Sequence, residues 1–287
     1  MTATRGEPAI RVLSLGAGVQ SSVLLLLAAS GRIPRPDVAV FADTQWEPAA
    51  VYRHLQRLRP IAEQAGIELV TVSAGNIRTD ATDPESRFAS MPMFTLGPQG
   101  QRGMARRQCT SQYKINCIKR EVRRRLGYVH PVRVPAGVHA VMQVGISLDE
   151  IGRARDSDVR YMVNSFPLLD MAWRREDCVR HLEANGLPDT PRSSCVGCPY
   201  HDDAFWHDLK VNSPEEWQQA VEFDHAIRHG SARANANGHP LRGQFFLHAS
   251  RVPLDEVVLR PKAKQPYLGG CGPFACASGV SASEGVA

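Results

Sequence analysis

The chain lacks any long apolar run. Its longest wholly apolar stretch is VLLLLAA, residues 23–29, which is too short to cross the hydrocarbon core of a bilayer. The opening residues, MTATRGEPAI, have no apolar segment of the kind that a secretory signal requires. We therefore expect a cytoplasmic protein that makes no membrane contact.

Two common nucleotide-binding motifs are missing as well. The first glycine-rich stretch, VLSLGAGVQSSVLLLL at residues 12–27, is neither GxxxxGK[ST] nor GxGxxG, so the P-loop and dinucleotide-binding classes are disfavoured. No internal repeat is visible. A net charge of +5 and a hydrophobic content of 43% are ordinary for a globular protein and do not by themselves imply a nucleic-acid partner.

What is present is a loop of small residues between an apolar strand and an apolar helix. IRVLSL predicts a buried strand at 10–15, and SSVLLLLAASG predicts a helix that ends at Gly31. Such a loop exposes the N–H groups at the start of the helix, where the helix dipole is positive. We expect it to bind an anionic group such as phosphate or sulfate.

Strands and helices then alternate, which predicts an α/β fold with a doubly wound parallel sheet. Further strands are expected at 37–43, 67–74 and 139–147, and helices at 47–66, 111–127, 175–186 and 213–230. Residues 76–105 contain several prolines and glycines and predict a long active-site loop. The expected organisation is a flexible N-terminus at 1–9, a nucleotide-binding α/β domain with cysteine-rich segments at 10–210, a C-terminal helical region at 211–267 and a flexible tail at 268–287.

Asp43 ends the second predicted strand, so it should lie beside the first loop at the carboxyl edge of the sheet. Its carboxylate could hold a ribose hydroxyl or a Mg²⁺ ion. Asp and Thr are also good helix caps. The sequence leaves both interpretations open for Asp43 and Thr44.

The seven cysteines of a cytoplasmic protein favour metal binding, catalysis or burial over disulfides. Cys195 and Cys198 form a CxxC pair that could be a metal half-site or a redox pair. Cys178 lies on a predicted helix, where a small buried residue is the plain interpretation. Cys271 and Cys276 lie in the glycine-rich tail and are either a mobile nucleophile or persulfide carrier, or incidental.

Positive charge is concentrated at residues 102–125, which hold nine Lys or Arg and one acidic residue, Glu121. Such a cluster is typical of a phosphate-binding surface, or else of a solvated helix face.

Several motifs in order, from about Ile10 to His201, resemble the phosphoadenosine phosphosulfate reductase family, part of the adenine nucleotide α-hydrolase group with the ATP pyrophosphatases (PP-loop enzymes). SLGAGVQSS resembles the group's pyrophosphate or sulfate loop, and VFADTQWEP its segment after the second strand. CTSQYKINCI and SSCVGCPYH are similar to the family's two cysteine segments. FPLLDMAWRREDCVRHLEANGLP and VGISLDEIGRAR resemble two further family segments.

The resemblance implies roles for particular residues. The phosphate or sulfate would be held by Ser14, Gly16, Gly18, Gln20, Ser21 and Ser22, and the nucleotide would be faced by Asp43 and Thr44. Arg153 would contact the anion, and Lys114 would lie near both anion and cluster. The ligands of a [4Fe–4S] cluster would be Cys109, Cys195 and Cys198.

The chain departs from the family pattern at several positions. Thr110 stands where the cluster-bearing reductases have the second cysteine of a pair. The fourth ligand is then Cys178 or Cys117, or one iron stays open and can bind hydrosulfide. Gln20 stands where ATP pyrophosphatases usually have Asp, and GGCGPFAC only loosely resembles the reductases' C-terminal motif.

Three functions follow from the resemblance. The first is an ATP-dependent sulfurtransferase that uses Mg·ATP to adenylate a nucleobase or small molecule and then inserts sulfur. The second is a phosphoadenosine or adenosine phosphosulfate reductase, in which a tail cysteine attacks the sulfate sulfur. The third is a non-catalytic, zinc-containing nucleic-acid-binding module. The expected partners are an adenine nucleotide, a sulfur or electron donor such as a cysteine desulfurase or a thioredoxin-like protein, a nucleic-acid acceptor and a second copy of the chain in a homodimer.

Overall fold

The computed structural model describes residues 6–83, 91–230 and 243–260. Its main element is a five-stranded sheet in the order β3-β2-β1-β6-β7, in which every neighbouring pair is parallel. Its strands are β1 (Ile10–Leu15), β2 (Val38–Asp43), β3 (Glu68–Ser73), β6 (Ala140–Gln143) and β7 (Met162–Ser165). The predicted α/β class with a doubly wound parallel sheet is confirmed.

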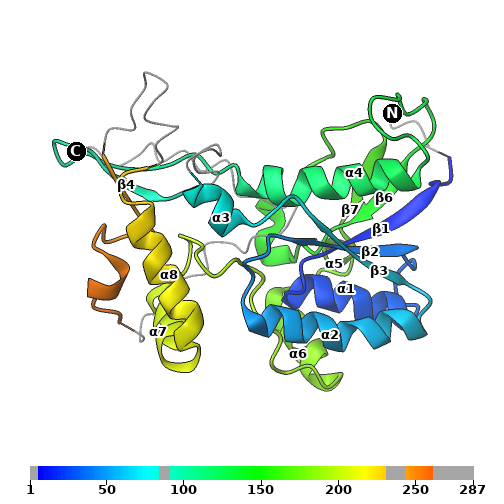
Figure 1. The fold of residues 1–287 in the computed structure, drawn as a ribbon. Coiled ribbons are helices and arrows are strands. Elements are labelled where there is room, and N and C mark those ends of the chain that lie inside the picture. The colour runs from blue at the N-terminus through cyan, green and yellow to red at the C-terminus, as the bar shows by residue number, and fades with distance from the viewer. Residues whose placement is uncertain (1–5, 84–90, 231–242, 261–287) are drawn as a thin grey trace.

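Helices cover both faces of this sheet (Figure 1). One face carries α1 (Val19–Ala29), α2 (Ala49–Gln64) and α6 (Arg175–Ala184), and the other carries α4 (Asn116–Arg125). Helix α1 is apolar almost all round and nearly fully buried, as expected for a helix enclosed between the sheet and other helices. The chain order reverses between β1 and β6, and ligands of doubly wound sheets bind at this reversal, beyond the carboxyl ends of the strands.

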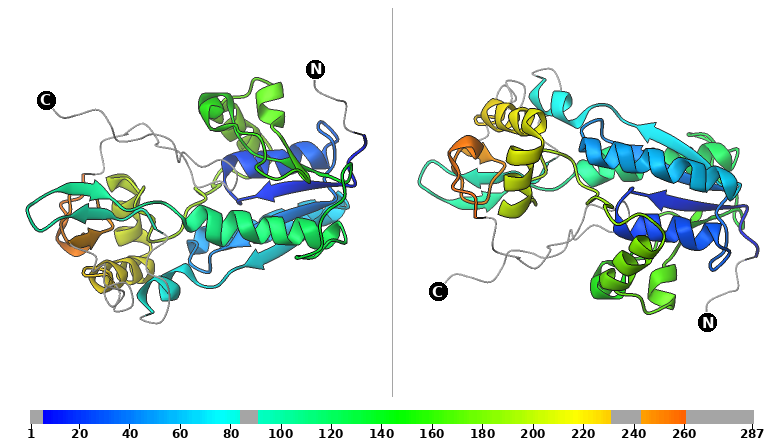
Figure 2. Two further views of the ribbon diagram at one scale, coloured as in Figure 1. Left: turned by 90° about the horizontal axis from the view of Figure 1, so that it is seen from above. Right: turned by 90° about the horizontal axis from the view of Figure 1, so that it is seen from below.

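A second, smaller unit lies beyond those carboxyl ends (Figure 2). It contains an antiparallel sheet in the order β5-β4-β8. Its elements are β4 (Phe94–Leu96), β5 (Arg102–Met104), β8 (Gln244–Phe246), α3 (Ile77–Thr82), α7 (Asp203–Asn212) and α8 (Pro214–Ala226). The prediction of one long loop at 76–105 is therefore wrong, because α3 and the β4–β5 hairpin fall within it.

The unit is assembled from segments that are distant in the chain, since β4 pairs with both β5 and β8. The predicted domain boundary at 210/211 falls inside α7. The apolar core of the unit includes Trp46, Met93, Trp206 and Phe223, and Cys195 belongs to the same cluster. The smaller unit thus covers the carboxyl ends of the parallel strands.

Short elements connect these layers. They are the π-helical turn η1 (Thr110–Ile115), the 3-10 turns η2 (Leu148–Arg153) and η3 (Leu254–Glu256), and α5 (Pro167–Asp170). The helix predicted at 111–127 is thus π-helical at its start and α-helical afterwards. No helix in the described parts of the chain combines the length and apolarity needed to cross a membrane.

Candidate functional site

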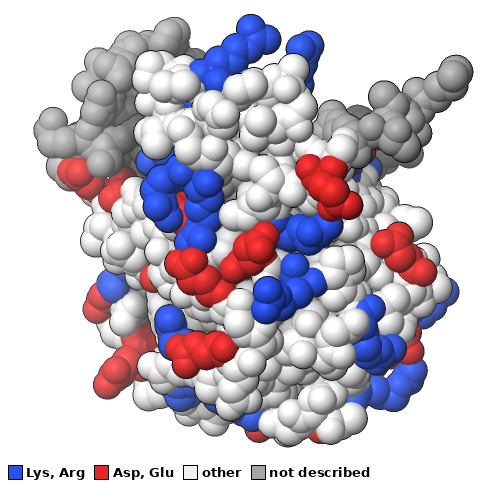
Figure 3. Space-filling view, turned by 90° about the vertical axis from the view of Figure 1, so that its right-hand side faces the viewer, with Lys and Arg blue, Asp and Glu red and all other residues white. Residues whose placement is uncertain are grey.

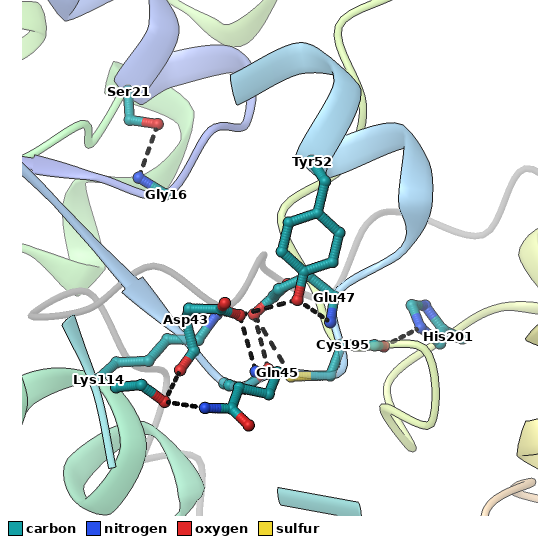
Figure 4. Close-up of polar contacts among 11 residues, drawn as sticks. Gly16, Ser21, Asp43, Gln45, Glu47, Tyr52, Lys114, Cys195 and His201 are labelled. Carbon is teal, nitrogen blue, oxygen red and sulfur yellow. Dashed lines mark hydrogen bonds and ion pairs between the residues drawn. The ribbon is translucent and has the colours of Figure 1, made fainter. Parts of the chain in front are cut away.

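The loop after β1 is built to hold an oxygen atom. The backbone N–H groups of Gly16 and Gly18 both donate to the hydroxyl oxygen of Ser21, at 3.1 and 3.3 Å. Figure 4 shows the hydrogen bond from Gly16. Between the two glycines, Ala17 has a φ of +52°, a left-handed conformation that is uncommon for a residue with a side chain. Successive N–H groups turned inward in this way form an anion-binding nest. A phosphate or sulfate oxygen would compete with the Ser21 hydroxyl for both donors.

A segment from far along the chain lies against this loop. A Cβ atom on Gly16 would come within 2.9 Å of Ser193 Oγ, and one on Gly18 within 2.9 Å of Ser193 Cβ. The Ser193 hydroxyl is buried and has no hydrogen-bond partner among the described residues. Buried polar atoms are normally satisfied, so this hydroxyl is suited to a ligand held by the loop. We did not predict Ser193, although its place two residues before Cys195 was an available signal.

Gln20 connects the start of α1 to a group of charged residues. Its side-chain amide donates to Glu150 at 3.1 Å and accepts from Arg175 at 3.1 Å. Glu150 also forms an ion pair with Arg153, and burial raises the pKa of the Glu150 carboxyl. Arg153 was predicted to contact the anion; the structure connects it to Gln20 through Glu150, and a contact with the anion stays a prediction. Arg175, at the first turn of α6, was not predicted because its position depends on the contact between α1 and α6.

The remaining serines of the motif differ in their surroundings. Ser14, on β1, is buried, and its hydroxyl has no hydrogen-bond partner among the described residues. Ser22 is fully buried; its hydroxyl lies 2.8 Å from His54 Nε2, and its N–H donates to the Gly18 carbonyl. Ser22 therefore joins α1 to α2, and both its polar groups are used within the fold.

The buried contact at His54 makes stability depend on pH. Burial, with a smaller effect of the Arg57 charge, lowers the pKa of His54 from 6.5 to about 4. The unfolded chain therefore takes up a proton below about pH 6.5, whereas the folded chain does not take it up until about pH 4. The contribution of His54 to the free energy of unfolding is thus complete above about pH 6.5 and decreases as the pH falls towards 4. We expect this histidine alone to lower the free energy of unfolding by about 2 kcal/mol as the pH falls from about 6.5 to 5. Urea unfolding of the wild type and of His54→Gln measures it: the variant should lose less stability over this interval, and equal losses would contradict the assignment.

Asp43 is held in place at the end of β2. Its Oδ1 accepts from the Tyr52 hydroxyl at 2.8 Å and from the Gln45 N–H at 2.7 Å. Burial, followed by this hydrogen bond, raises the pKa of Tyr52. The N-cap residue of α2 is Pro48, so Asp43 and Thr44 do not cap that helix and the capping interpretation is wrong.

A buried ion pair lies directly beyond Asp43. Lys114 Nζ is 2.9 Å from Glu47 Oε1, and their side chains are only 5% and 1% exposed. The same carboxylate oxygen accepts from Thr44 Oγ1 at 3.0 Å and from Cys195 Sγ at 3.6 Å, and Thr44 Oγ1 lies 3.1 Å from Cys195 Sγ (Figure 4). Of the predicted site residues, Thr44 thus contacts the first cysteine of the CxxC pair directly, and Lys114 is connected to it through Glu47. Glu47 was not predicted.

The CxxC pair forms a turn that is fixed from several sides. The N–H of Cys198 and Nε2 of His201 both donate to the Cys195 carbonyl, at 3.1 and 2.8 Å. Burial lowers the pKa of His201 to about 3, so the imidazole is neutral and carries its proton on the donating nitrogen. The N–H of Val196 donates to the carbonyl of Trp46 at 2.8 Å. The turn is therefore attached to the segment that follows Asp43.

Cys109 lies in the same region as this pair. It immediately precedes η1, and both it and Cys195 pack in the core of the smaller unit. Two residues before Cys109, the Arg107 guanidinium lies 5.2 Å from the ring centroid of Tyr200, close in sequence to Cys198. Cysteine thiolates are the donors that iron–sulfur clusters use, and a cluster held by Cys109, Cys195 and Cys198 stays a prediction. Within residues 6–83, 91–230 and 243–260, no three His, Cys, Asp or Glu side chains are arranged so that they could already hold a metal ion.

The structure does not bring Cys178 to the other three thiols. It is fully buried on α6, in the core cluster formed by α1 and α2, and burial raises its pKa to about 12. Cys117 is buried on α4, where its sulfur accepts from Arg120 at 3.4 Å. The plain interpretation of Cys178 as a core residue therefore agrees with its position. Cys271 and Cys276 lie outside the described residues.

The comparisons with known proteins are sparse. No protein-family model matches the chain, and no curated protein matches it. Among solved structures it is similar to "U34-tRNA thiolase NcsA from Methanococcus maripaludis with its [4Fe-4S] cluster", at 14% identity over 90% of this chain and 85% of that one, with a TM-score of 0.40. A likeness this distant carries no argument about function.

Proposed function

We propose that this protein is an ATP-dependent sulfurtransferase. The observation that carries the proposal is that Ser193 lies against the Gly16–Gly18 nest while Cys195, two residues later, contacts Thr44 and Glu47 just beyond Asp43. An oxyanion nest and a cysteine pair therefore share one site. This arrangement is suited to an enzyme that activates an acceptor with a nucleotide and delivers sulfur at the same place.

The proposed reaction consumes ATP and hydrosulfide and needs no external oxidant or reductant. A carbonyl oxygen of the acceptor attacks the α-phosphorus of ATP, the bond to the β-phosphate oxygen breaks and pyrophosphate leaves. Hydrosulfide then forms a C–S bond at the same carbon, the C–O bond to AMP breaks and one proton is released. The activation converts oxide, a poor leaving group, into AMP, a good one.

The residues of the chain have separate tasks in this proposal. The N–H groups of Gly16 and Gly18, with the hydroxyls of Ser21 and Ser193, hold the pyrophosphate. The Asp43 carboxylate faces the ribose or Mg²⁺. Lys114 acts as a positioning residue, because its ammonium group holds Glu47 beside Cys195.

Cys109, Cys195 and Cys198 would hold a [4Fe–4S] cluster, whose fourth iron, when no protein ligand occupies it, can bind hydrosulfide. Because Cys178 lies in a different core cluster, the fourth iron is left to Cys117 or stays open.

A phosphosulfate reductase is the second candidate. Two observations favour it. The first observation is that the nest fits a sulfate as well as a phosphate. The second is that the first turn of α1 has Gln20 at the position where a carboxylate would help to hold Mg²⁺. The side chain of Gln20 is hydrogen-bonded to Glu150 and Arg175. Anaerobic calorimetric titrations with Mg·ATP, phosphoadenosine phosphosulfate and adenosine phosphosulfate separate the two candidates. Binding of ATP alone supports the sulfurtransferase, and binding of a phosphosulfate alone supports the reductase.

Gly18→Val is expected to weaken Mg·ATP binding by about tenfold or more, a loss of about 1.4 kcal/mol. The added side chain would begin 2.9 Å from Ser193 Cβ and 3.2 Å from its backbone nitrogen, so the CxxC segment must move away from the nest. Gly6→Val is the matched control, since a Cβ there meets nothing within 4 Å. Equal affinities of the two variants, by calorimetry, would remove the loop from the nucleotide site.

A further inference from the structure

A cavity lies at the end of the parallel sheet opposite to the candidate site. Its volume is about 600 Å³, and it is lined by residues 133–139, which precede β6, and by Arg160 and Tyr161, which precede β7. A six-residue strand such as β1 is roughly 20 Å long, which is the distance between its amino and carboxyl ends. This cavity is therefore separate from the site at the carboxyl ends of the strands.

The cavity is basic. Arg123, Arg133 and Arg160 line it, and none of the described residues that line it is acidic. Arg133 and Arg160 are exposed, and neither forms a hydrogen bond or ion pair with the described part of the chain. Figure 3 faces this end of the molecule: Lys and Arg project at its upper edge without Asp or Glu between them, whereas both signs are mixed lower down. Guanidinium groups in this situation are suited to an anionic ligand.

The wall of the cavity is fixed before any ligand binds. Arg123, from α4, donates to the carbonyls of Tyr128 and Val132 and so anchors the connection that forms one wall. Its guanidinium lies 5.7 Å from the ring centroid of Tyr161. The His139 carbonyl accepts from the Ala9 N–H at 2.9 Å. A wall fixed in this way lowers the entropy cost of binding.

The lining is not uniformly polar. Val134, Pro135, Ala136 and Val138 provide an apolar side, and Tyr161 provides an aromatic ring. The volume lies in the range of small-molecule sites, about 300–1,000 Å³. A small inorganic anion would leave the apolar side and the ring without contacts.

We propose that this cavity binds a phosphate monoester carried on a flat, partly apolar group of the size of a mononucleotide. Arg133 and Arg160 bind the phosphate, and the ring of Tyr161 and the apolar side contact the base and sugar. The monoester can come from a free nucleotide or from the 5′-phosphorylated end of a nucleic acid, because both present the same chemical group. The proposal does not depend on the function of the site at the other edge.

The test uses the full chain with two charge-matched double variants. Arg133→Glu/Arg160→Glu reverses the charge of the cavity. Arg53→Glu/Arg59→Glu makes the same change in net charge at exposed positions on α2, away from the cavity. Each protein is titrated with AMP by calorimetry, and with a 5′-phosphorylated oligoribonucleotide and its 5′-hydroxyl counterpart by fluorescence anisotropy. Circular dichroism confirms that each variant is folded.

We expect Arg133→Glu/Arg160→Glu to weaken binding of AMP, of the 5′-phosphorylated oligomer or of both by roughly tenfold or more, and the α2 variant to leave it unchanged. Loss with AMP alone identifies a free nucleotide as the ligand, and loss with the oligomer identifies a nucleic-acid end. Equal effects of the two double variants would overturn the proposal. The proposal would also be overturned if AMP binding were unaffected and Arg133→Glu/Arg160→Glu lost the same affinity for the 5′-phosphorylated and the 5′-hydroxyl oligoribonucleotide.

Discussion

Cys195→Ser is expected to leave the anaerobically purified protein with little iron and acid-labile sulfide and without the broad visible absorbance of an iron–sulfur cluster. Cluster ligands in proteins are thiolates, and a serine hydroxyl is a poor replacement. The serine can still hydrogen-bond to Thr44 and Glu47, the two contacts of the thiol, so the local fold should persist. Iron and sulfide assays and the absorption spectrum measure the effect.

Cys178→Ala is the matched control for this experiment. Cys178 is a residue of α6 and lies in the core cluster that α6 shares with α1, apart from Cys109, Cys195 and Cys198. The variant should therefore keep its iron and sulfide. Full cluster content in Cys195→Ser would refute the ligand assignment. Zinc without labile sulfide in the wild type would instead support the zinc-containing binding module.

Glu47→Ala is expected to lower the free energy of unfolding by about 3–5 kcal/mol. The substitution removes the carboxylate that binds the Lys114 ammonium in an environment where both side chains are almost completely buried. It also removes the acceptor of hydrogen bonds from Thr44 and Cys195. Urea unfolding, monitored by circular dichroism, measures the change.

Two further variants identify the cause. In Glu47→Leu/Lys114→Met both charges are replaced by apolar groups, which is often neutral for a buried pair, so most of the lost stability should return. Glu222→Ala breaks the more exposed pair with Arg78 and should cost less than about 1 kcal/mol. If the double variant is as unstable as Glu47→Ala, the loss comes from packing and not from the buried charge.

The basic segment at 102–125 shows where a pattern in the sequence left two interpretations open. Much of its charge is engaged in the fold: Arg125 and Arg124 pair with Glu121, Arg125 also pairs with Glu68, and Lys114 is buried against Glu47. The run of positive charge is therefore partly structural. Its contact with a nucleic acid remains a prediction.

The order of strands and helices along residues 10–73, and the position of the loop of small residues after β1, could be predicted from the sequence alone. These features depend on local information: the period of the apolar residues, and small residues between a strand and a helix. The strand predicted at 10–15 coincides with β1, and the helix predicted at 175–186 with α6 to within two residues. For the same reason Gly16, Gly18 and Ser21 could be named before their N–H groups and hydroxyl were seen to meet.

The tertiary structure was needed to show which side chains from distant segments come together. Cys195 reaches Glu47 across 148 residues of chain, Ser193 covers the loop after β1, and Arg175 reaches Gln20 across 155 residues. It also separated Cys178 from the other thiols and assembled β4, β5 and β8 into one sheet. Such contacts depend on how whole helices and sheets pack, and no periodicity within one segment records which distant segment will lie against it.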